Sequence, residues 1–416
     1  MNILLKNLSN TFNYGSMMMG ENLIYKITSK TKSDVKFYIQ TRDERNLERI
    51  RKATGCQEIY NDNILDMELL TEKIKYVRYV EKVVREKINY LKACNFYDAV
   101  IYLGGDDFAE TYYTIPNDNK IIKHVLKEVD FFSRKCKTFM IGQTIGPYTG
   151  IRKEWASKYL SNARIYTRDD KCFDYLKKEL NINSTKSRDL AFLDLNLQEE
   201  YEKKCKTVLN SYNIKSSEYI TFVGTGLLNS YTNNEKEMLT KILDMLKAIS
   251  VKFKNKKIVY LSHVVLPKNS SDNNMIEKLK KLDSKFMQSI IIIDRPILPA
   301  EARVILGNGY FTLTFRMHAA VSTFQMGKPA ISFAYSKKYE GVIGDGLNMH
   351  DLIIDCRGDY DYNNLRSDAL NKVNLLVSNY DEICAKSKKN VAKCKTIVEE
   401  TLEDVVKILE SDKDEK

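Results

Sequence analysis

Short apolar segments alternate with longer amphipathic segments along most of the chain. In the first half, Val35–Gln40, Asp98–Leu103 and Lys137–Ile141 have the length and composition of buried strands. The segment between the last two, Asn119–Phe132, places its apolar residues at helical spacing. Strands of four to six residues that are separated by helices predict parallel βαβ units.

The alternation stops in a polar stretch and then restarts. Gln198–Ser217 is rich in charge and contains a helical pattern of its own, which is typical of a linker. The strands Tyr219–Val223 and Lys257–Leu261 open the second series, and Asn364–Leu409 reads as two closing helices. At 416 residues the chain exceeds the size at which one core stops growing, so we expect two domains.

The predicted fold class is therefore α/β, with two doubly wound Rossmann-like domains facing each other across a cleft and a C-terminal helical tail. The expected boundaries are residues 1–197 for the first domain, 198–217 for the linker, 218–362 for the second domain and 363–416 for the helices.

A long helical pattern runs from Ile64 to Cys94. Its apolar residues recur at helical spacing, at Leu70, Ile74, Val77, Val84, Ile88 and Leu91. Such a stripe normally forms one face of a domain core, which is the interpretation we prefer. Packing against a second subunit is the alternative.

Composition limits the kinds of partner. The chain carries 66 Lys plus Arg against 55 Asp plus Glu, a net charge of +11, which suits anionic partners. Solvated lysine faces account for most of this excess, and no zinc knuckle, RNP-like strand or Arg-rich arm indicates nucleic-acid binding. The eight cysteines lack metal-ligand spacing and suit reduced thiols in a cytoplasmic protein with no metal site. No segment reads as a signal peptide or as a membrane span, so we expect a soluble protein.

The richest chemistry lies in Tyr310–Lys338. A strand ends at Arg316, His318 stands in the first turn of a short helix, and Lys338 follows the next strand. A right-handed crossover brings the two strand ends to one edge of the sheet. A helix N-terminus favours phosphate or carboxylate, so this edge could hold a small anion and transfer protons to it.

Polar residues also follow strands of the first half. Gly104, Gly105, Asp106 and Asp107 come after one strand, GQTIGP (residues 142–147) after the next, and Arg168 after a third. We expect these segments to be turns at the carboxyl edge of the first sheet. Capping of turns by the aspartates is an equally good interpretation.

Read in order, the motifs resemble the polysaccharide pyruvyl transferase family. FNYGSMMMGENLIY resembles its Asn-x-Gly loop, LGGDDF its Gly-Gly turn, and GQTIGPY its third motif. TRDD, SRDLAF, the Arg-x-His of residues 316–318 and GKPAISFAYSKKYEGVIGDG complete the set, which spans about residues 13–351. Two departures are Ser16, where members often have Asp, and Asp106–Asp107, where Gly and Ser are usual.

The resemblance implies a GT-B-like fold and transfer of pyruvate from phosphoenolpyruvate to two hydroxyls of a sugar, giving a cyclic ketal and phosphate. Arg316 and Lys338 would clamp the donor, and His318 would contact the donor as the general acid or as a proton donor to the phosphate leaving group. Arg168 would reach the donor from the first domain, unless it only pairs with Asp169. The acceptor-side candidates are Asn13, Asp106, Asp107 and Gln143, with Asp106 or Asp107 as the base; His263 ranks lower.

Other functions stay open. A nucleotide-sugar glycosyltransferase on the same fold is the main alternative, and an inactive sugar-binding module is a third. We expect no cofactor besides the donor substrate. The acceptor sugar could be linked to a lipid, a nucleotide or a polymer, and a lipid-linked acceptor would bring the protein to an anionic membrane surface. A homo-oligomer is also left open.

Overall fold

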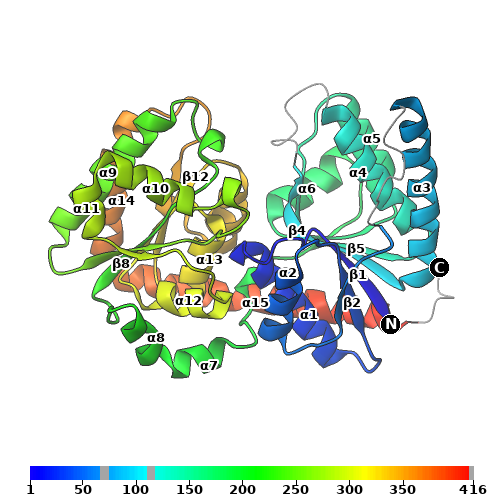
Figure 1. Cartoon of the computed structure of the whole chain (residues 1–416), viewed down its shortest axis with the longest axis horizontal. Helices are drawn as coiled ribbons and strands as arrows, with labels where there is room; N and C mark the ends of the chain where they lie inside the picture. Colours follow the sequence, from blue (N-terminus) through cyan, green and yellow to red (C-terminus); the bar gives the residue numbers. More distant parts are fainter. Residues whose placement is uncertain (66–74, 110–117, 412–416) are drawn as a thin grey trace. The chain divides into compact units, whose positions relative to one another are not determined.

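A computed structural model of the chain describes residues 1–65, 75–109 and 118–411 (Figure 1). The chain divides into two compact units. The first unit contains Met1–Thr11, Met19–Ser187 and Glu399–Lys416, and the second contains Phe12–Met18 and Arg188–Val398. The short segment Phe12–Met18 thus groups with the second unit although its neighbours in the sequence belong to the first.

The first unit is built on a parallel sheet with the strand order β3-β2-β1-β4-β5-β6-β7, and helices cover both of its faces (Figure 1). The strands are β1 (Asn2–Lys6), β2 (Lys36–Ile39), β3 (Ile59–Asn61), β4 (Ala99–Phe108), β5 (Lys137–Ile145), β6 (Arg164–Thr167) and β7 (Thr185–Lys186). The helices are α1 (Tyr14–Lys30), α2 (Glu44–Thr54), α3 (Lys75–Phe96), α4 (Asp118–Ser133), α5 (Ile151–Leu160) and α6 (Asp170–Glu179). Because both faces are covered, the central strands are continuous apolar runs, and Ile3, Leu4 and Leu5 of β1 are fully buried.

The second unit contains a parallel sheet with the order β10-β9-β8-β11-β12-β13. The strands are β8 (Tyr219–Val223), β9 (Lys257–Leu261), β10 (Ile291–Ile293), β11 (Thr312–Thr314), β12 (Ala330–Ala334) and β13 (Ile353–Asp355). The helices are α7 (Gln198–Lys203), α8 (Cys205–Ser211), α9 (Glu235–Lys252), α10 (Asn273–Leu282), α11 (Ser284–Gln288), α12 (Pro299–Asn308), α13 (Met317–Gln325), α14 (Leu365–Ser378) and the long α15 (Tyr380–Glu410), whose residues from Glu399 onward belong to the first unit.

The expected fold class of two parallel-sheet α/β domains with C-terminal helices is confirmed. The tail forms α14 and α15 within the range predicted for it. The single helix predicted in the linker is instead two short helices, α7 and α8.

Two of the predicted turns are wrong. Gly104 to Asp107 lie inside β4, and Gly142 to Ile145 lie inside β5. The ladder between these strands continues past the predicted ends, pairing Gly105 with Gln143, and becomes irregular between Gly105 and Phe108. Glycine and aspartate are poor strand formers, but the irregular pairing at the carboxyl ends of these two central strands accommodates them.

The interpretation of the Ile64–Cys94 pattern as a core stripe is also wrong where it can be checked. The helix begins at Lys75, Ile64 lies in a bend, and Leu70 and Ile74 lie outside the described residues. The side chains of Val84, Ile88 and Leu91 are exposed rather than buried in the core.

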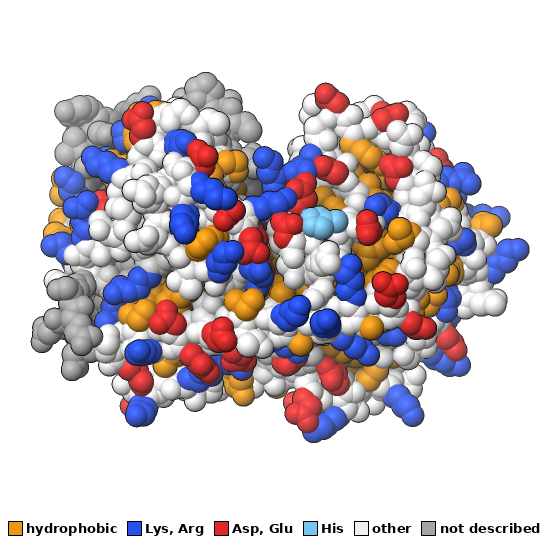
Figure 2. All heavy atoms as spheres, turned by 180° about the vertical axis from the view of Figure 1, so that it is seen from behind, with side chains coloured by type: hydrophobic (Ala, Val, Ile, Leu, Met, Phe, Trp, Pro, Cys, Tyr) orange, Lys and Arg blue, Asp and Glu red, His pale blue; other side chains and the backbone are white. Residues whose placement is uncertain are grey.

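Charge is distributed over the surface. Figure 2 shows lysine and arginine side chains interspersed with acidic ones over the face that it presents, as the solvated-face interpretation of the net charge expects. None of the described helices is both long enough and apolar enough to cross a membrane.

Candidate active site

The N-terminus of α13 lies at the carboxyl edge of the second sheet. The strand β11 ends at Thr314, whose hydroxyl accepts a hydrogen bond from the Arg316 N–H at 2.8 Å and donates one to the Arg316 carbonyl at 3.0 Å. This turn sets Arg316 at the start of α13 as its N-cap residue, and the Arg316 side chain makes no capping hydrogen bond there. The first N–H groups of the helix can therefore serve an anion.

The Arg316 guanidinium is held by a buried carboxylate. Its Nε and Nη2 donate to Asp272 Oδ1 at 3.0 and 2.7 Å, and Nη2 also donates to the Ser270 carbonyl at 3.2 Å. Burial acts to lower the pKa of Arg316, but the charge and hydrogen bonds of Asp272 outweigh it and raise the pKa above its usual value. Nη1 makes no hydrogen bond to the described part of the chain, so Arg316 can still donate to a ligand through this nitrogen.

Asp272 also organises the neighbouring loop. Its Oδ1 accepts from the Gly226 N–H at 3.0 Å, and its Oδ2 accepts from the N–H groups of His263 and Val264, each at 2.9 Å. The carboxylate is fully buried, so the Arg316–Asp272 pair joins the ends of three strands. Sequence reasoning missed Asp272, because it lies in a polar loop with no recognisable motif.

A second buried carboxylate contacts the candidate catalytic histidine. Asp189 Oδ2 lies 3.2 Å from His318 Nε2, and Asp189 Oδ1 accepts from the Ala191 N–H at 2.9 Å. Asp189 is fully buried, whereas the His318 side chain keeps 17% of its surface exposed. A carboxylate on one ring nitrogen fixes the orientation of a histidine and stabilises its protonated form, as in hydrolase triads. The SRDLAF motif contained this aspartate, but the sequence did not assign it a role.

The Asn-x-Gly loop packs against the other side of the same ring. A β-carbon placed on Gly15 would lie 2.2 Å from His318 Nδ1, a distance that no real contact allows. Asn13 Oδ1 accepts from the Gly15 N–H at 3.2 Å, and Asn13 pairs with Val264 in an isolated antiparallel bridge. Only glycine fits at position 15, so this loop is shaped around His318 within the second unit.

His263 is a buried neutral histidine beside these groups. Its ring packs against Tyr14 with centroids 5.3 Å apart, and its carbonyl accepts from the Tyr14 N–H at 3.0 Å. Burial, and then the positive charges of His318, Arg316 and Arg303, lower the pKa of His263 well below its usual value. Its role in the geometry is to support the Asn13–Gly15 loop.

Lys338 stands after β12, as predicted. Its Nζ donates to the Tyr335 hydroxyl at 2.6 Å and lies 4.7 Å from the centre of the same ring. Tyr335 is also among the groups that raise the pKa of Arg316, so both cations lie near this phenol. Ser336, which lies between Tyr335 and Lys338 in the sequence, is buried, and its hydroxyl has no hydrogen-bond partner among the described residues.

The carboxyl edge of the first sheet brings together Arg168 and Asp106. Arg168 Nη2 forms an ion pair with Asp106 Oδ1, and Nε donates to the Thr144 hydroxyl at 2.8 Å. Arg168 is 99% buried, and Asp169 caps α6 by accepting from the Cys172 N–H at 2.7 Å. Arg168, which was predicted to bind the donor substrate, is therefore paired with Asp106, which was predicted to bind the acceptor sugar.

The other first-unit candidates differ in access. Gln143 is fully buried on β5, with Nε2 donating to the Leu103 carbonyl. Asp107 is exposed, and its carboxylate folds toward Gly105, where an added β-carbon would lie 2.6 Å from Oδ2. Asp107 is thus the first-unit candidate that reaches solvent most readily. The acceptor roles of Asn13, Asp106, Asp107 and Gln143 stay predictions.

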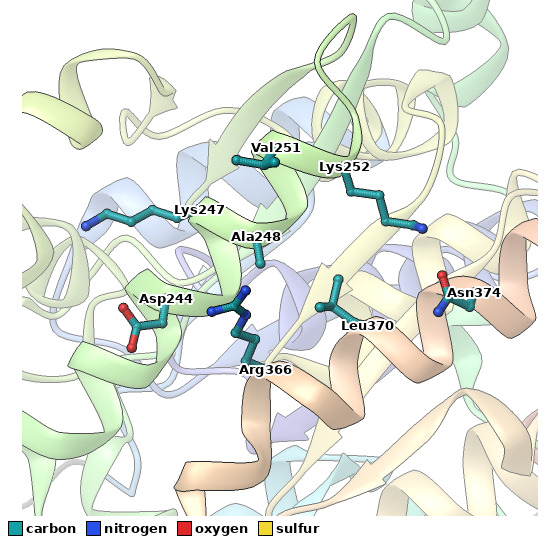
Figure 3. Close-up of a pocket in the computed structure, with 8 residues that line it drawn as sticks. All are labelled: Asp244, Lys247, Ala248, Val251, Lys252, Arg366, Leu370 and Asn374. Atoms are coloured by element: carbon teal, nitrogen blue, oxygen red, sulfur yellow. The ribbon is translucent and has the colours of Figure 1, made fainter.

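A surface groove of about 400 Å³ lies between α9 and α14 in the second unit (Figure 3). Arg366 and Leu370 point from α14 toward α9, while Lys247 and Lys252 point away along the surface (Figure 3). None of the predicted site residues lines this groove, so we assign it no part in the site.

Residues 13–337 match the family model described as polysaccharide pyruvyl transferase. No curated protein sequence matches the chain.

Among solved structures, the chain is similar to UDP-GlcNAc 2-epimerase from Neisseria meningitidis bound to UDP-GlcNAc, with a TM-score of 0.62 and 11% identity over 98% of this chain and 100% of that one. A putative UDP-N-acetylglucosamine 2-epimerase from Listeria monocytogenes gives 0.60 and 11% over 100% and 98% of the two chains. The Methanocaldococcus jannaschii UDP-GlcNAc 2-epimerase in complex with UDP-GlcNAc and UDP gives 0.56 and 14% over 90% and 92%. At these identities the likeness shows the GT-B-like fold alone.

Proposed function

The chain belongs to the polysaccharide pyruvyl transferase family, and from this membership we propose that it transfers the pyruvyl group of phosphoenolpyruvate to hydroxyls of a sugar in polysaccharide biosynthesis, forming a pyruvate ketal and releasing phosphate. The observation that carries the proposal is the partly exposed His318, held by the buried Asp189 at a helix N-terminus that the Arg316 side chain does not cap. The proposed reaction needs a positioned proton donor beside an anion-binding site, and this edge offers both.

The donor would bind through its charged groups. Phosphoenolpyruvate carries a phosphate and a carboxylate, which are both anionic near neutral pH. The candidate contacts are the N-terminus of α13, Nη1 of Arg316, Nζ of Lys338 and the buried hydroxyl of Ser336. Lysine acts as a point charge, and arginine contributes a directional donor.

The chemistry divides into two additions at carbon 2 of the donor. A proton added to the methylene carbon makes carbon 2 electrophilic, and one sugar hydroxyl attacks it and loses its proton to a base. The bond from carbon 2 to the phosphate oxygen then breaks with its electron pair on phosphate, and the second hydroxyl forms the second C–O bond as its proton passes to the departing phosphate. We assign His318 to protonate the methylene carbon or the departing phosphate, with Asp189 orienting the ring.

The acceptor side is proposed at the first-unit strand ends. Asp107 is the best-placed base candidate, because it is exposed while Asp106 neutralises Arg168. The acceptor could be carried by a lipid, a nucleotide or a polymer. A lipid carrier would place the enzyme at an anionic membrane surface.

The test is phosphate release from phosphoenolpyruvate by the purified protein with a panel of sugar acceptors, without nucleotide or added metal. We expect release with a suitable acceptor and none without one. Turnover of a nucleotide sugar, with phosphoenolpyruvate ignored, would instead support a nucleotide-sugar glycosyltransferase.

A further inference from the structure

Helix α3 of the first unit exposes three large apolar side chains in succession. Val84, Ile88 and Leu91 are 49%, 46% and 53% exposed. Their spacing of four and then three residues places them on one face of the helix, over two turns. Scattered single apolar residues are ordinary on a protein surface, but a continuous stripe of this kind marks an interaction surface.

The opposite face of α3 is already engaged. The Tyr90 ring packs against Phe131 and Phe132 of α4, with centroids 5.4 and 5.5 Å apart, and its hydroxyl donates to Glu128 at 3.1 Å. The Glu86 carboxylate lies 3.2 Å from Nδ1 of His124, which is also on α4. Rotation of α3 to bury the stripe would break all of these contacts, so the outward orientation follows from packing.

Within residues 84–96, the charged side chains that flank the stripe on α3 are lysines. At about 100° per residue, Lys87 and Lys92 fall on opposite sides of the line from Val84 to Leu91, and both are exposed. From Val84 to Phe96 the one acidic residue is Glu86, and it turns toward α4. The outer face of this part of α3 thus combines apolar side chains with positive charge.

We propose that this face, the α3 patch (Val84, Lys87, Ile88, Leu91 and Lys92), docks on the anionic surface of a lipid membrane. An amphipathic helix with an apolar face between lysines lies in the membrane interface, with the apolar side chains below the headgroups and the lysines among them. A second copy of the chain is a poorer occupant, because two such faces would bring lysines of the same charge together. The proposal does not depend on the donor or on the reaction.

The experiment is flotation of the full-length protein with vesicles, at low and at high salt. We expect binding to phosphatidylcholine mixed with phosphatidylglycerol, little binding to phosphatidylcholine alone, and weaker binding at high salt because exposed charges are screened. No binding to the mixed vesicles would overturn the proposal, whatever the outcome of the phosphate-release assay.

Two double variants locate the surface. Lys87→Gln with Lys92→Gln should weaken binding to mixed vesicles about 25-fold, since each lysine near such a surface contributes about fivefold. Ile88→Ser with Leu91→Ser should weaken it at least about tenfold through lost apolar burial. The control is Val251→Ser on α9, which removes another highly exposed valine, 67% accessible, from the second unit.

Equal binding of the wild type and the Ile88→Ser, Leu91→Ser variant would contradict the proposal. So would a wild-type dimer, measured by light scattering, that this variant converts to a monomer, because the patch would then be a subunit interface. Unchanged melting temperatures would show that each variant keeps its fold, as expected for exposed positions.

Discussion

The carboxyl edges of the two sheets carry similar residue types but use them differently. At the first edge, Arg168 is buried and paired with Asp106, and the buried Gln143 is bonded to a backbone carbonyl. At the second edge, the Arg316 side chain does not cap the helix N-terminus and His318 keeps 17% of its side chain exposed. Charge at the end of a strand is therefore not enough to identify a ligand site. A ligand site also needs hydrogen-bond donors or charges that are not already paired with other side chains of the protein.

The same distinction applies within the second edge. Arg316 directs most of its donors to Asp272 and Ser270, whereas His318 makes one ion-pair contact with Asp189. Arg316 therefore has mainly a structural role, whereas His318 is the residue that we propose as catalytic.

The largest effect is expected from breaking the buried ion pair between Arg316 and Asp272. Asp272→Asn should lower the free energy of unfolding by about 3 to 5 kcal/mol, because it leaves the buried Arg316 without its counter-charge. Denaturant titration would measure this, with the half-buried Asp244→Asn on α9 as the control. A loss below about 1 kcal/mol would mean that the pair does not hold this edge together.

His318→Gln should reduce acceptor-dependent phosphate release about 10²- to 10⁴-fold, as expected when a general acid is removed. Because the substitution also removes a partner of the buried Asp189, a melting curve should establish that the variant is folded at the assay temperature. His350→Gln is the matched control, since His350 is 52% exposed and pairs with Asp345 at 2.9 Å. Full turnover by His318→Gln would remove the catalytic assignment and leave the family membership intact.

Gly15→Ala should reduce the same activity about 10²-fold, because its β-carbon would displace the His318 ring. Gly346→Ala is the control, since the nearest atom to its β-carbon would be the Gly341 carbonyl at 3.4 Å. If Gly15→Ala behaved like Gly346→Ala, the Asn13–Gly15 loop would not position His318.

The smallest effect is expected in the pH dependence of the free energy of unfolding, through the buried His263. Its pKa is lowered in the folded protein, so the unfolded chain binds the extra proton and stability falls as pH drops below the ordinary histidine pKa of about 6.5. The slope should reach about 1.4 kcal/mol per pH unit for this one group. Denaturant titrations between neutral and mildly acidic pH should therefore separate wild type from His263→Phe, and parallel curves would contradict the assignment.

The fold was predictable because its signals are local. Alternating apolar strands and amphipathic helices specify parallel α/β domains, and Arg316, His318 and Lys338 stand at the predicted places relative to β11, α13 and β12. The partners were not predictable, because Asp189, Asp272 and Gly15 come from distant parts of the sequence. The extension of β4 and β5 through glycines and aspartates runs against strand propensity, and the exposed stripe of α3 has the same periodicity as a core stripe.

The central claim is that the second edge is the phosphoenolpyruvate site. Calorimetric titration of phosphoenolpyruvate into wild type, Lys338→Gln and Asp107→Asn tests it most directly. The account predicts binding to wild type, about tenfold weaker binding to Lys338→Gln through the lost point charge, and unchanged binding to Asp107→Asn. Affinity that is kept in Lys338→Gln and lost in Asp107→Asn, or binding of UDP-GlcNAc with none of phosphoenolpyruvate, would contradict it.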